Sequence, residues 1–382
     1  MSLRIGIVAA EPSGDTLAAG LIRAVRARRP DATFEGVAGP RMIAAGCDAW
    51  FAMERLSVMG LVEVLRHLPE LVGIRRALAR RWRDAPPDLF VGVDGPDFNL
   101  ALEARLRRGG VRTVHYVCPT VWAWRQGRVR TLRASAELVL SIFPFESRFL
   151  AAHGVAARYV GHPLADEIAP RPDPIPARAR LGMATAATTL AVLPGSRLSE
   201  IDSLGPPFVE AVRRLAQSRP GLQVVTPLVN DLTRKRFEAI LAAAQPAVPW
   251  RLVDDAREAL AAADVVLTAS GTATLEALLV GRPMVVGYRV HPLTYRVVRM
   301  LRLVKVPHIA MANLLAGERL APELVQDACT GEGLAAALDG FLDDPARAAA
   351  VRARYAELAA GMRCDTNAQA ADAVLALIEG RP

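Results

Sequence analysis

Residues 189–197 read TLAVLPGSR, an apolar run that ends in a glycine turn. A second run, DVVLTAS at 264–270, passes into the turn and helix-like stretch SGTATLE at 270–276 in the same way. An apolar run, a glycine turn and then a helical pattern are typical of the strand–helix units of parallel sheets. The two stretches therefore predict an α/β fold.

The same alternation continues along the whole chain. Further strand-like runs occupy residues 4–9, 89–94, 113–117, 138–143, 222–229, 250–255 and 283–289, with helical patterns between several of them. This order predicts βαβ units in doubly wound, Rossmann-like sheets. A chain of 382 residues exceeds what one core usually organises, so we expect two such domains that face a cleft.

Five prolines between residues 163 and 176 mark the boundary between the domains, where we expect neither a helix nor a central strand. The predicted domains are a first domain at residues 1–165 and a second domain at 166–350, which contains both glycine turns. Helices predicted at 345–360 and 366–379 follow, and we expect the terminal segment 351–382 to cross back to the first domain.

Composition describes an ordered protein with a basic surface. Hydrophobic residues make up 52% of the chain, and 47 Lys and Arg face 39 Asp and Glu, which gives a net charge of +8. A basic balance suits nucleic acid, phosphorylated substrates or an anionic membrane. The four cysteines show no pairing or metal pattern, which favours a reducing compartment, and no apolar stretch reaches the roughly 20 residues that cross a bilayer.

The two glycine turns are candidate anion sites. The first N–H groups of a helix lack partners and carry partial positive charge, so backbone donors at Gly195, Ser196, Gly271 and Thr272 could hold one diphosphate. Arg197 would add a forked cation. The alternative is that Ser and Thr in these turns only cap the helices.

The first half carries candidate acidic residues at strand ends. Asp94 ends the run LFVGVD and could serve as a general base, whereas Asp97 more simply caps the following helix. In AEPSGD at 10–15, Glu11 and Ser13 could contact a substrate, and Asp15 is expected to cap its own helix. His162, before the proline-rich stretch, could contact substrate or be structural.

Two alternatives are disfavoured by missing patterns. Tryptophans 122 and 124 with nearby arginines suggest nucleic acid, but no nucleic-acid-binding module signature accompanies them, so we expect no such partner. No histidine or carboxylate spacing typical of a metal site occurs, so we expect no metal.

An amphipathic stretch at residues 58–72 is followed by five arginines. Its apolar positions could enter a membrane or contact acyl chains while the arginines meet anionic headgroups, although a core helix with a basic face is an equal alternative. The apolar candidates are Met59, Leu61, Val62, Leu65 and Leu68. Residues 289–305 form a second basic and apolar stretch.

Taken in order, the motifs resemble those of the lipid-A-disaccharide synthase family, glycosyltransferase family 19. They run over nearly the whole chain and include AEPSGD, VMGLVEVL at 58–65, VGVDGPDFN at 91–99, HYVCPTVWAWR at 115–125, VGHPL at 160–164, LPGSR, ASGTATLEALL and ANLLAGE at 312–318. The resemblance implies the GT-B fold and no cofactor. It also implies transfer of 2,3-diacylglucosamine from its UDP derivative to 2,3-diacylglucosamine 1-phosphate (lipid X), with inversion, at the cytoplasmic face of the Gram-negative inner membrane.

The resemblance also implies roles for individual residues. Asp94 would take the proton of the acceptor hydroxyl, and Arg197 would neutralise the leaving UDP with the amides of the turns, including Ser270. Glu276 would bind the ribose, and Glu11, Ser13 and Asn313 would contact the sugars. The sequence leaves a homodimer open.

Other functions remain as alternatives. One is a different UDP-sugar enzyme of the same fold, such as a peptidoglycan N-acetylglucosaminyltransferase or a UDP-sugar epimerase. Another is a nucleotide-sensing membrane scaffold without turnover.

Overall fold

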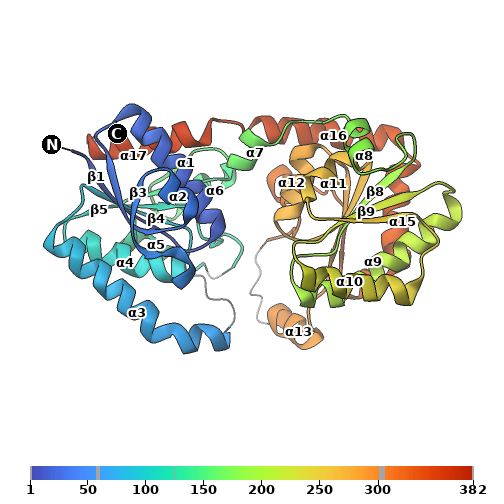
Figure 1. The fold of residues 1–382 in the computed structure, drawn as a ribbon, viewed down its shortest axis with the longest axis horizontal. Helices are drawn as coiled ribbons and strands as arrows, with labels where there is room; N and C mark the ends of the chain where they lie inside the picture. Colours follow the sequence, from blue (N-terminus) through green and yellow to red (C-terminus); the bar gives the residue numbers. More distant parts are fainter. Residues whose placement is uncertain (1, 57–60, 125, 301–305, 381–382) are drawn as a thin grey trace. The chain divides into compact units, whose positions relative to one another are not determined.

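The computed structural model describes residues 2–56, 61–124, 126–300 and 306–380, without the side chains of 61–66, 294, 298 and 299. The chain forms two compact units (Figure 1). The first contains Met1–Asp166 and Met362–Pro382, and the second contains Glu167–Gly361. Each unit is built on one parallel sheet, which confirms the predicted fold class.

The first unit has strands in the order β3-β2-β1-β4-β5-β6-β7 within the described residues. Their bounds are β1 (Arg4–Ala9), β2 (Thr33–Ala38), β3 (Cys47–Ala52), β4 (Leu89–Val93), β5 (Arg112–Tyr116), β6 (Leu138–Ser141) and β7 (Ala157–Tyr159). The helices are α1 (Pro12–Arg28), α2 (Pro40–Ala44), α3 (Leu61–Asp84), α4 (Pro96–Arg108), α5 (Arg128–Ser135), α6 (Pro144–Ala152) and α17 (Thr366–Ile378), with α7 (Pro163–Glu167) at the boundary.

The second unit has strands in the order β10-β9-β8-β11-β12-β13 within the described residues. They are β8 (Thr189–Leu193), β9 (Gln223–Pro227), β10 (Trp250–Val253), β11 (Val265–Ala269), β12 (Met284–Tyr288) and β13 (Glu323–Val325). The helices are α8 (Pro174–Arg180), α9 (Leu198–Ser218), α10 (Asp231–Ala244), α11 (Ala256–Ala262), α12 (Thr272–Val280), α13 (Pro292–Met300), α14 (Met311–Ala316), α15 (Gly331–Leu342) and α16 (Pro345–Ala360).

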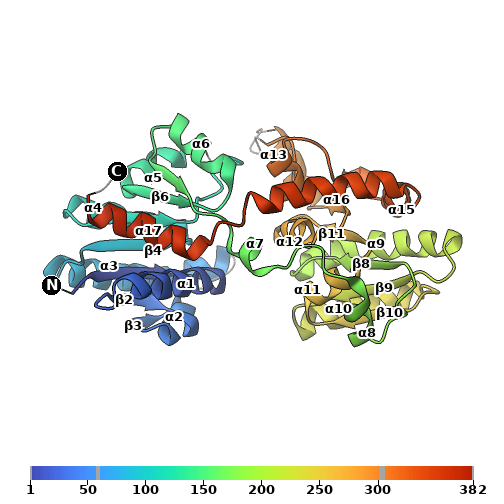
Figure 2. The same cartoon turned by 90° about the horizontal axis from the view of Figure 1, so that it is seen from above.

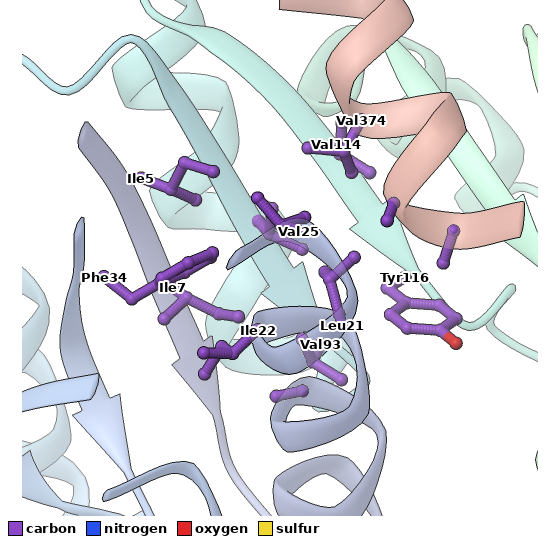
Figure 3. Close-up of a cluster of buried hydrophobic side chains, with 14 of the residues drawn as sticks. Ile5, Ile7, Leu21, Ile22, Val25, Phe34, Val93, Val114, Tyr116 and Val374 are labelled. Atoms are coloured by element: carbon purple, nitrogen blue, oxygen red, sulfur yellow. The ribbon is translucent and has the colours of Figure 1, made fainter. Parts of the chain in front are cut away.

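Helices cover both faces of the first sheet, which explains why its central strands are continuous apolar runs. On one face, α1 and α17 lie side by side against the strands (Figures 1 and 2). Figure 3 shows this core, with α17 contributing Val374 and the other elements contributing Ile5, Ile7, Leu21, Ile22, Val25, Phe34, Val93, Val114 and Tyr116. On the other face, Trp82 of α3 packs edge-on against Phe90 of β4, with ring centroids 5.1 Å apart.

The strand order fixes where a ligand can bind in each unit. The chain leaves β1 and β4 in opposite directions along the sheet, and it does the same at β8 and β11. Such a reversal opens a crevice at the carboxyl ends of the two strands, where ligands of doubly wound sheets bind. The turns after these four strands are the ones that carry Glu11, Asp94, Gly195 and Gly271.

Two expectations about the chain segments are wrong. The proline-rich stretch contains α7, which begins at Pro163, and the start of α8, because proline is tolerated in the first helical turn, where its missing N–H has no partner to lose. The second unit also extends past residue 350 to Gly361. Helix α16 belongs to it because the helix buries Val351 and Tyr355 while packing on α12 and α15.

Asp15 caps a different helix from the one expected. It lies in the first turn of α1 and is buried, and its carboxylate accepts the N–H groups of Arg41 (3.0 Å) and Met42 (2.9 Å). Those amides open α2, whose own N-cap is Gly39. The carboxylate therefore joins α1 to α2 and satisfies donors that α2 cannot satisfy itself.

Candidate functional site

The two glycine turns of the second unit lie next to each other. Strands β8 and β11 pair in parallel with Leu193 opposite Thr268, so the turns leave the sheet at the same level. Gly195 has φ +120° and Gly271 has φ +142°, backbone conformations that favour glycine. A side chain at 195 would also collide with the carboxylate of Glu200.

A cavity of about 340 Å³ lies between these turns. All the residues predicted to bind the nucleotide line it, namely Gly195, Ser196, Arg197, Ser270, Gly271, Thr272 and Glu276. Its remaining wall includes Pro227, Val229, Asp254 and Ala256, at the ends of β9 and β10. The tertiary structure therefore gathers residues 80 positions apart into one concave surface.

The amides of the first turn are not open, which differs from expectation. Glu200 accepts the N–H of Ser196 at 2.8 Å and that of Arg197 at 3.2 Å, because its position in the first turn of α9 lets it act as a capping carboxylate. The Arg197 side chain is 72% exposed and lies 3.7 Å from Glu200. An anion that takes the Ser196 amide must displace Glu200.

The second turn leaves its helix start open to a ligand. No side chain caps α12, whose N-cap is Gly271. The neighbouring hydroxyls serve the fold instead: Ser270 donates to the carbonyl of Ile309 at 2.9 Å, and Thr274 donates to the carbonyl of Gly271 at 2.7 Å. The backbone N–H groups at this helix start are thus available to an anion, whereas the Ser270 and Thr274 hydroxyls are engaged within the fold.

Glu276 faces the cavity from α12 and is half-buried. Burial raises the pKa of this carboxyl, the neighbouring Arg257 lowers it, and Asp255 raises it further. A partly desolvated carboxylate in a cavity is a strong acceptor for hydroxyl groups.

A second cavity, of about 1050 Å³, adjoins the first and shares Arg197, Glu200, Ala269 and Ser270 with it. Its other residues come from α9 and from the ends of β12 and β13, including Tyr288, His291 and Gln326. This cavity could not be predicted from the sequence, because its lining comes from segments that no single motif joins.

In the first unit, Asp94 follows the central strand β4 and is half-buried. Its backbone has φ +51°, and its N–H donates to the carbonyl of Tyr116 at 2.8 Å. A Cβ at Gly95 would lie 2.8 Å from the Cβ of Ala10, so the turns after β1 and β4 are in close contact. Asp94 therefore stands in the crevice that the strand order predicts.

Asn99 fixes the backbone at this point and was missed as a functional residue. It is fully buried in α4, and its amide donates to the carbonyls of Asp94 (2.8 Å), Val93 (3.3 Å) and Val8 (3.4 Å). The sequence signal that could have identified it is an Asn in the first turn of a predicted helix, five residues after a strand-end carboxylate.

Backbone strain accompanies Asp94. Val117, which directly follows the adjacent strand β5, has φ +79°, a conformation that β-branched residues rarely adopt. Two neighbouring strand ends with left-handed residues indicate a site whose geometry the surrounding fold enforces.

Comparisons with known proteins identify the family of this chain. A family model described as lipid-A-disaccharide synthetase matches residues 5–376. The chain is 52% identical to the lipid-A-disaccharide synthase of Sodalis glossinidius over 98% of each chain, and 52% identical to that of Pseudomonas aeruginosa over 99% of each. The chain belongs to the lipid-A-disaccharide synthase family.

Solved structures at low identity share the fold. A glycosyltransferase of kitacinnamycin has a TM-score of 0.63 at 18% identity and covers 97% of this chain and 98% of its own. A UDP-GlcNAc 2-epimerase from Neisseria meningitidis, solved bound to UDP-GlcNAc, scores 0.62 at 11% identity and covers both chains fully. MurG from Acinetobacter baumannii scores 0.57 at 16% identity over 99% of each chain. The chain thus has the GT-B fold.

The sugar contacts expected from the family resemblance lie in different surroundings. Glu11 and Ser13 are exposed at the start of α1, beside the Asp94 turn. Asp97 is exposed and pairs with Arg128 instead of capping α4, whose N-cap is Gly95. Asp97 therefore does not have the helix-capping role that we assigned to it.

Asn313 has a structural role in this structure. It is fully buried, donates to Ala321 and Glu323, and accepts the N–H groups of Leu320 and Ala321. With its amide occupied, it cannot also face a sugar here. Glu323, missed by the sequence analysis, accepts the N–H groups of Ile309 and Ala310 and completes this network.

His162 is buried and stacks near Phe143, with ring centroids 5.2 Å apart. Its Nδ1 accepts the N–H of Leu164 at 3.2 Å, and burial lowers its pKa to about 4. Nearby, Glu146 accepts the indole N–H of Trp122 at 3.0 Å, and burial raises the pKa of that carboxyl to about 8. Near pH 7, burial therefore keeps both the His162 imidazole and the Glu146 carboxyl largely uncharged.

The His162→Gln variant should lose part of the acid sensitivity of the first unit. Between pH 6.5 and about 4 the unfolded histidine binds a proton and the folded one does not, so stability falls as the pH drops through this window, by up to about 3 kcal/mol. Urea unfolding from pH 4 to 7, followed by tryptophan fluorescence, measures this, because four of the five tryptophans lie in the first unit. The exposed His153→Gln variant is the control, and an unchanged pH slope in His162→Gln would refute the assignment.

The proposed membrane residues lie partly outside the described structure. Met59 is outside the described residues, and the side chains of Leu61, Val62 and Leu65 in α3 are not described. Leu68 is 47% exposed. None of the described helices is long and apolar enough to cross a bilayer. Among the described residues, no group of three His, Cys, Asp or Glu side chains could hold a metal ion.

Proposed function

We propose that the chain transfers 2,3-diacylglucosamine from its UDP derivative to lipid X and releases UDP. The observation that carries this proposal is the cavity between the turns after β8 and β11, which joins two helix starts, Arg197 and Glu276 in a member of this family. A helix start with backbone donors suits a diphosphate, and a half-buried carboxylate suits ribose hydroxyls.

The reaction proceeds by single displacement. The acceptor 6-hydroxyl oxygen forms a bond to the anomeric carbon of the donor as the bond to the UDP oxygen breaks, which inverts that carbon and gives a β-1,6 link. Asp94 takes the hydroxyl proton. Arg197 and the amides of Gly271 and Thr272 stabilise the charge on the leaving diphosphate.

We place the nucleotide on the second unit and the acceptor near Asp94 on the first. Crystals soaked with UDP test the first placement. Density for the diphosphate within hydrogen-bond distance of Arg197 supports it, and density on the first unit would overturn the assignment of roles.

Both substrates carry acyl chains, so we also propose that the enzyme works at the cytoplasmic face of the inner membrane. Met59, Leu61, Val62, Leu65 and Leu68 would enter the anionic surface, with the arginines that follow at its headgroups. Replacing Leu61, Val62 and Leu65 by Ser should weaken co-sedimentation with liposomes; unchanged binding would assign that patch to the core.

The experiment that tests the reaction is a thin-layer assay with radiolabelled lipid X. A disaccharide should form only when UDP-diacylglucosamine and lipid X are both present. An epimerase would instead convert the UDP-sugar alone, and a scaffold would bind UDP without any product.

A further inference from the structure

Helix α13 (Pro292–Met300) presents an apolar face that no other described element covers. Leu293, Val297 and Met300 are 63%, 46% and 75% exposed. Their spacing of four and three residues places them on one side of the helix. Figure 1 shows α13 at the lower edge of the second unit, below α9 and α10.

All the Asp, Glu, Lys and Arg positions in the sequence around this helix are basic. Between Glu276 and Glu318 the chain contains no Asp or Glu, and its cations are Arg282, Arg289, Arg296, Arg299, Arg302 and Lys305. Arg282 is buried, whereas Arg296 is exposed on α13 itself. An exposed apolar face within a basic, acid-free segment matches an anionic lipid surface.

The same charge pattern disfavours a second copy of the chain as the occupant. Two copies meeting through α13 would bring like charges together without an acidic residue in the segment to pair with them. A bilayer accepts the apolar side chains among its acyl chains and places the cations at its phosphates.

We propose that α13 lies in the plane of an anionic membrane and anchors the second unit to it. Val290, His291 and Pro292, at and just before the start of α13, line the cavity of about 1050 Å³. Docking α13 therefore brings the rim of this cavity to the lipid surface. The contact is separate from the α3 patch and does not depend on the proposed glycosyl transfer.

Vesicle partitioning tests the proposal with the full-length chain. The probes are vesicles of phosphatidylglycerol with phosphatidylcholine, and of phosphatidylcholine alone. In a background that already carries Leu61→Ser, Val62→Ser and Leu65→Ser, the added triple change Leu293→Ser, Val297→Ser and Met300→Ser should weaken binding to the anionic vesicles at least about tenfold. Arg296→Gln should weaken it about threefold, and only on anionic vesicles.

Matched controls separate insertion from general loss of apolar surface. Ile175→Ser with Leu232→Ser removes two side chains of the second unit that are 52% and 62% exposed, and binding should stay within about twofold. Met300→Ser alone guards against misfolding of the triple variant and should weaken anionic binding about threefold.

Either of two results would overturn the proposal. One is that the triple variant and the Met300→Ser variant bind the anionic vesicles within twofold of the background that lacks these changes. The other is that light scattering shows dimers in the background but not in the triple variant, while vesicle binding is unchanged. That result would make α13 a self-association surface. Because partitioning needs no turnover, a failed disaccharide assay would leave this test unaffected.

Discussion

The Asp94→Asn variant should lose turnover by about 10²–10⁴-fold while still binding UDP. Asparagine keeps the shape of the side chain but cannot take the proton of the acceptor hydroxyl. The left-handed backbone at Asp94 is compatible with Asn, and the Asn99 amide still holds the carbonyl of residue 94, so the site should keep its geometry. Steady-state kinetics with both substrates, together with calorimetric titration of UDP, measure the two properties separately.

Asp97→Asn is the matched control for this experiment. Asp97 lies three residues along the same chain segment, and its side chain is 79% exposed and paired with Arg128. Its loss should change turnover less than about threefold. Turnover of Asp94→Asn equal to that of the control would remove Asp94 from the mechanism.

Replacing Arg197 by Ala should lower kcat by about 10²–10³-fold and weaken product inhibition by UDP about tenfold or more. The side chain is the exposed cation of the cavity wall beside both glycine turns, and its loss leaves the diphosphate charge to the backbone donors. Arg197→Lys should recover part of the rate, because lysine supplies the charge without the forked geometry.

Arg214→Ala controls for the loss of one positive charge. Arg214 lies on the same helix, α9, with its side chain 46% exposed and paired with Glu210. It should leave kcat within about twofold. If Arg197→Ala binds UDP and turns over as well as Arg214→Ala does, the diphosphate does not lie on this turn.

Part of the fold could be predicted from the sequence, because some of its elements depend only on residues that are neighbours along the chain. The buried strands of parallel sheets are continuous apolar runs, so β1, β4, β8 and β11 are visible without tertiary information. The turns at Gly195 and Gly271 are equally local, because the left-handed backbone that they adopt favours glycine. Since both turns end parallel strands, their convergence on one cavity could also be expected.

Other features depend on partners that are distant in sequence. Asp15 satisfies amides 26 and 27 residues away, and the amide of Asn313 is filled by a network that includes Glu323. A capping motif or a side-chain amide in the sequence therefore indicates a polar role but not which group it serves.

The sequence by itself determined the two parallel sheets, the glycine turns and the family, because apolar periodicity, backbone preference and motif order are all written along the chain. Only the tertiary structure decided that Glu200 occupies the Ser196 amide, that Asn99 holds the Asp94 turn, and that α13 keeps an uncovered apolar face. The physical reason is that buried polar groups take whichever partner the packed elements bring within hydrogen-bond distance, and burial itself is a property of the assembled fold.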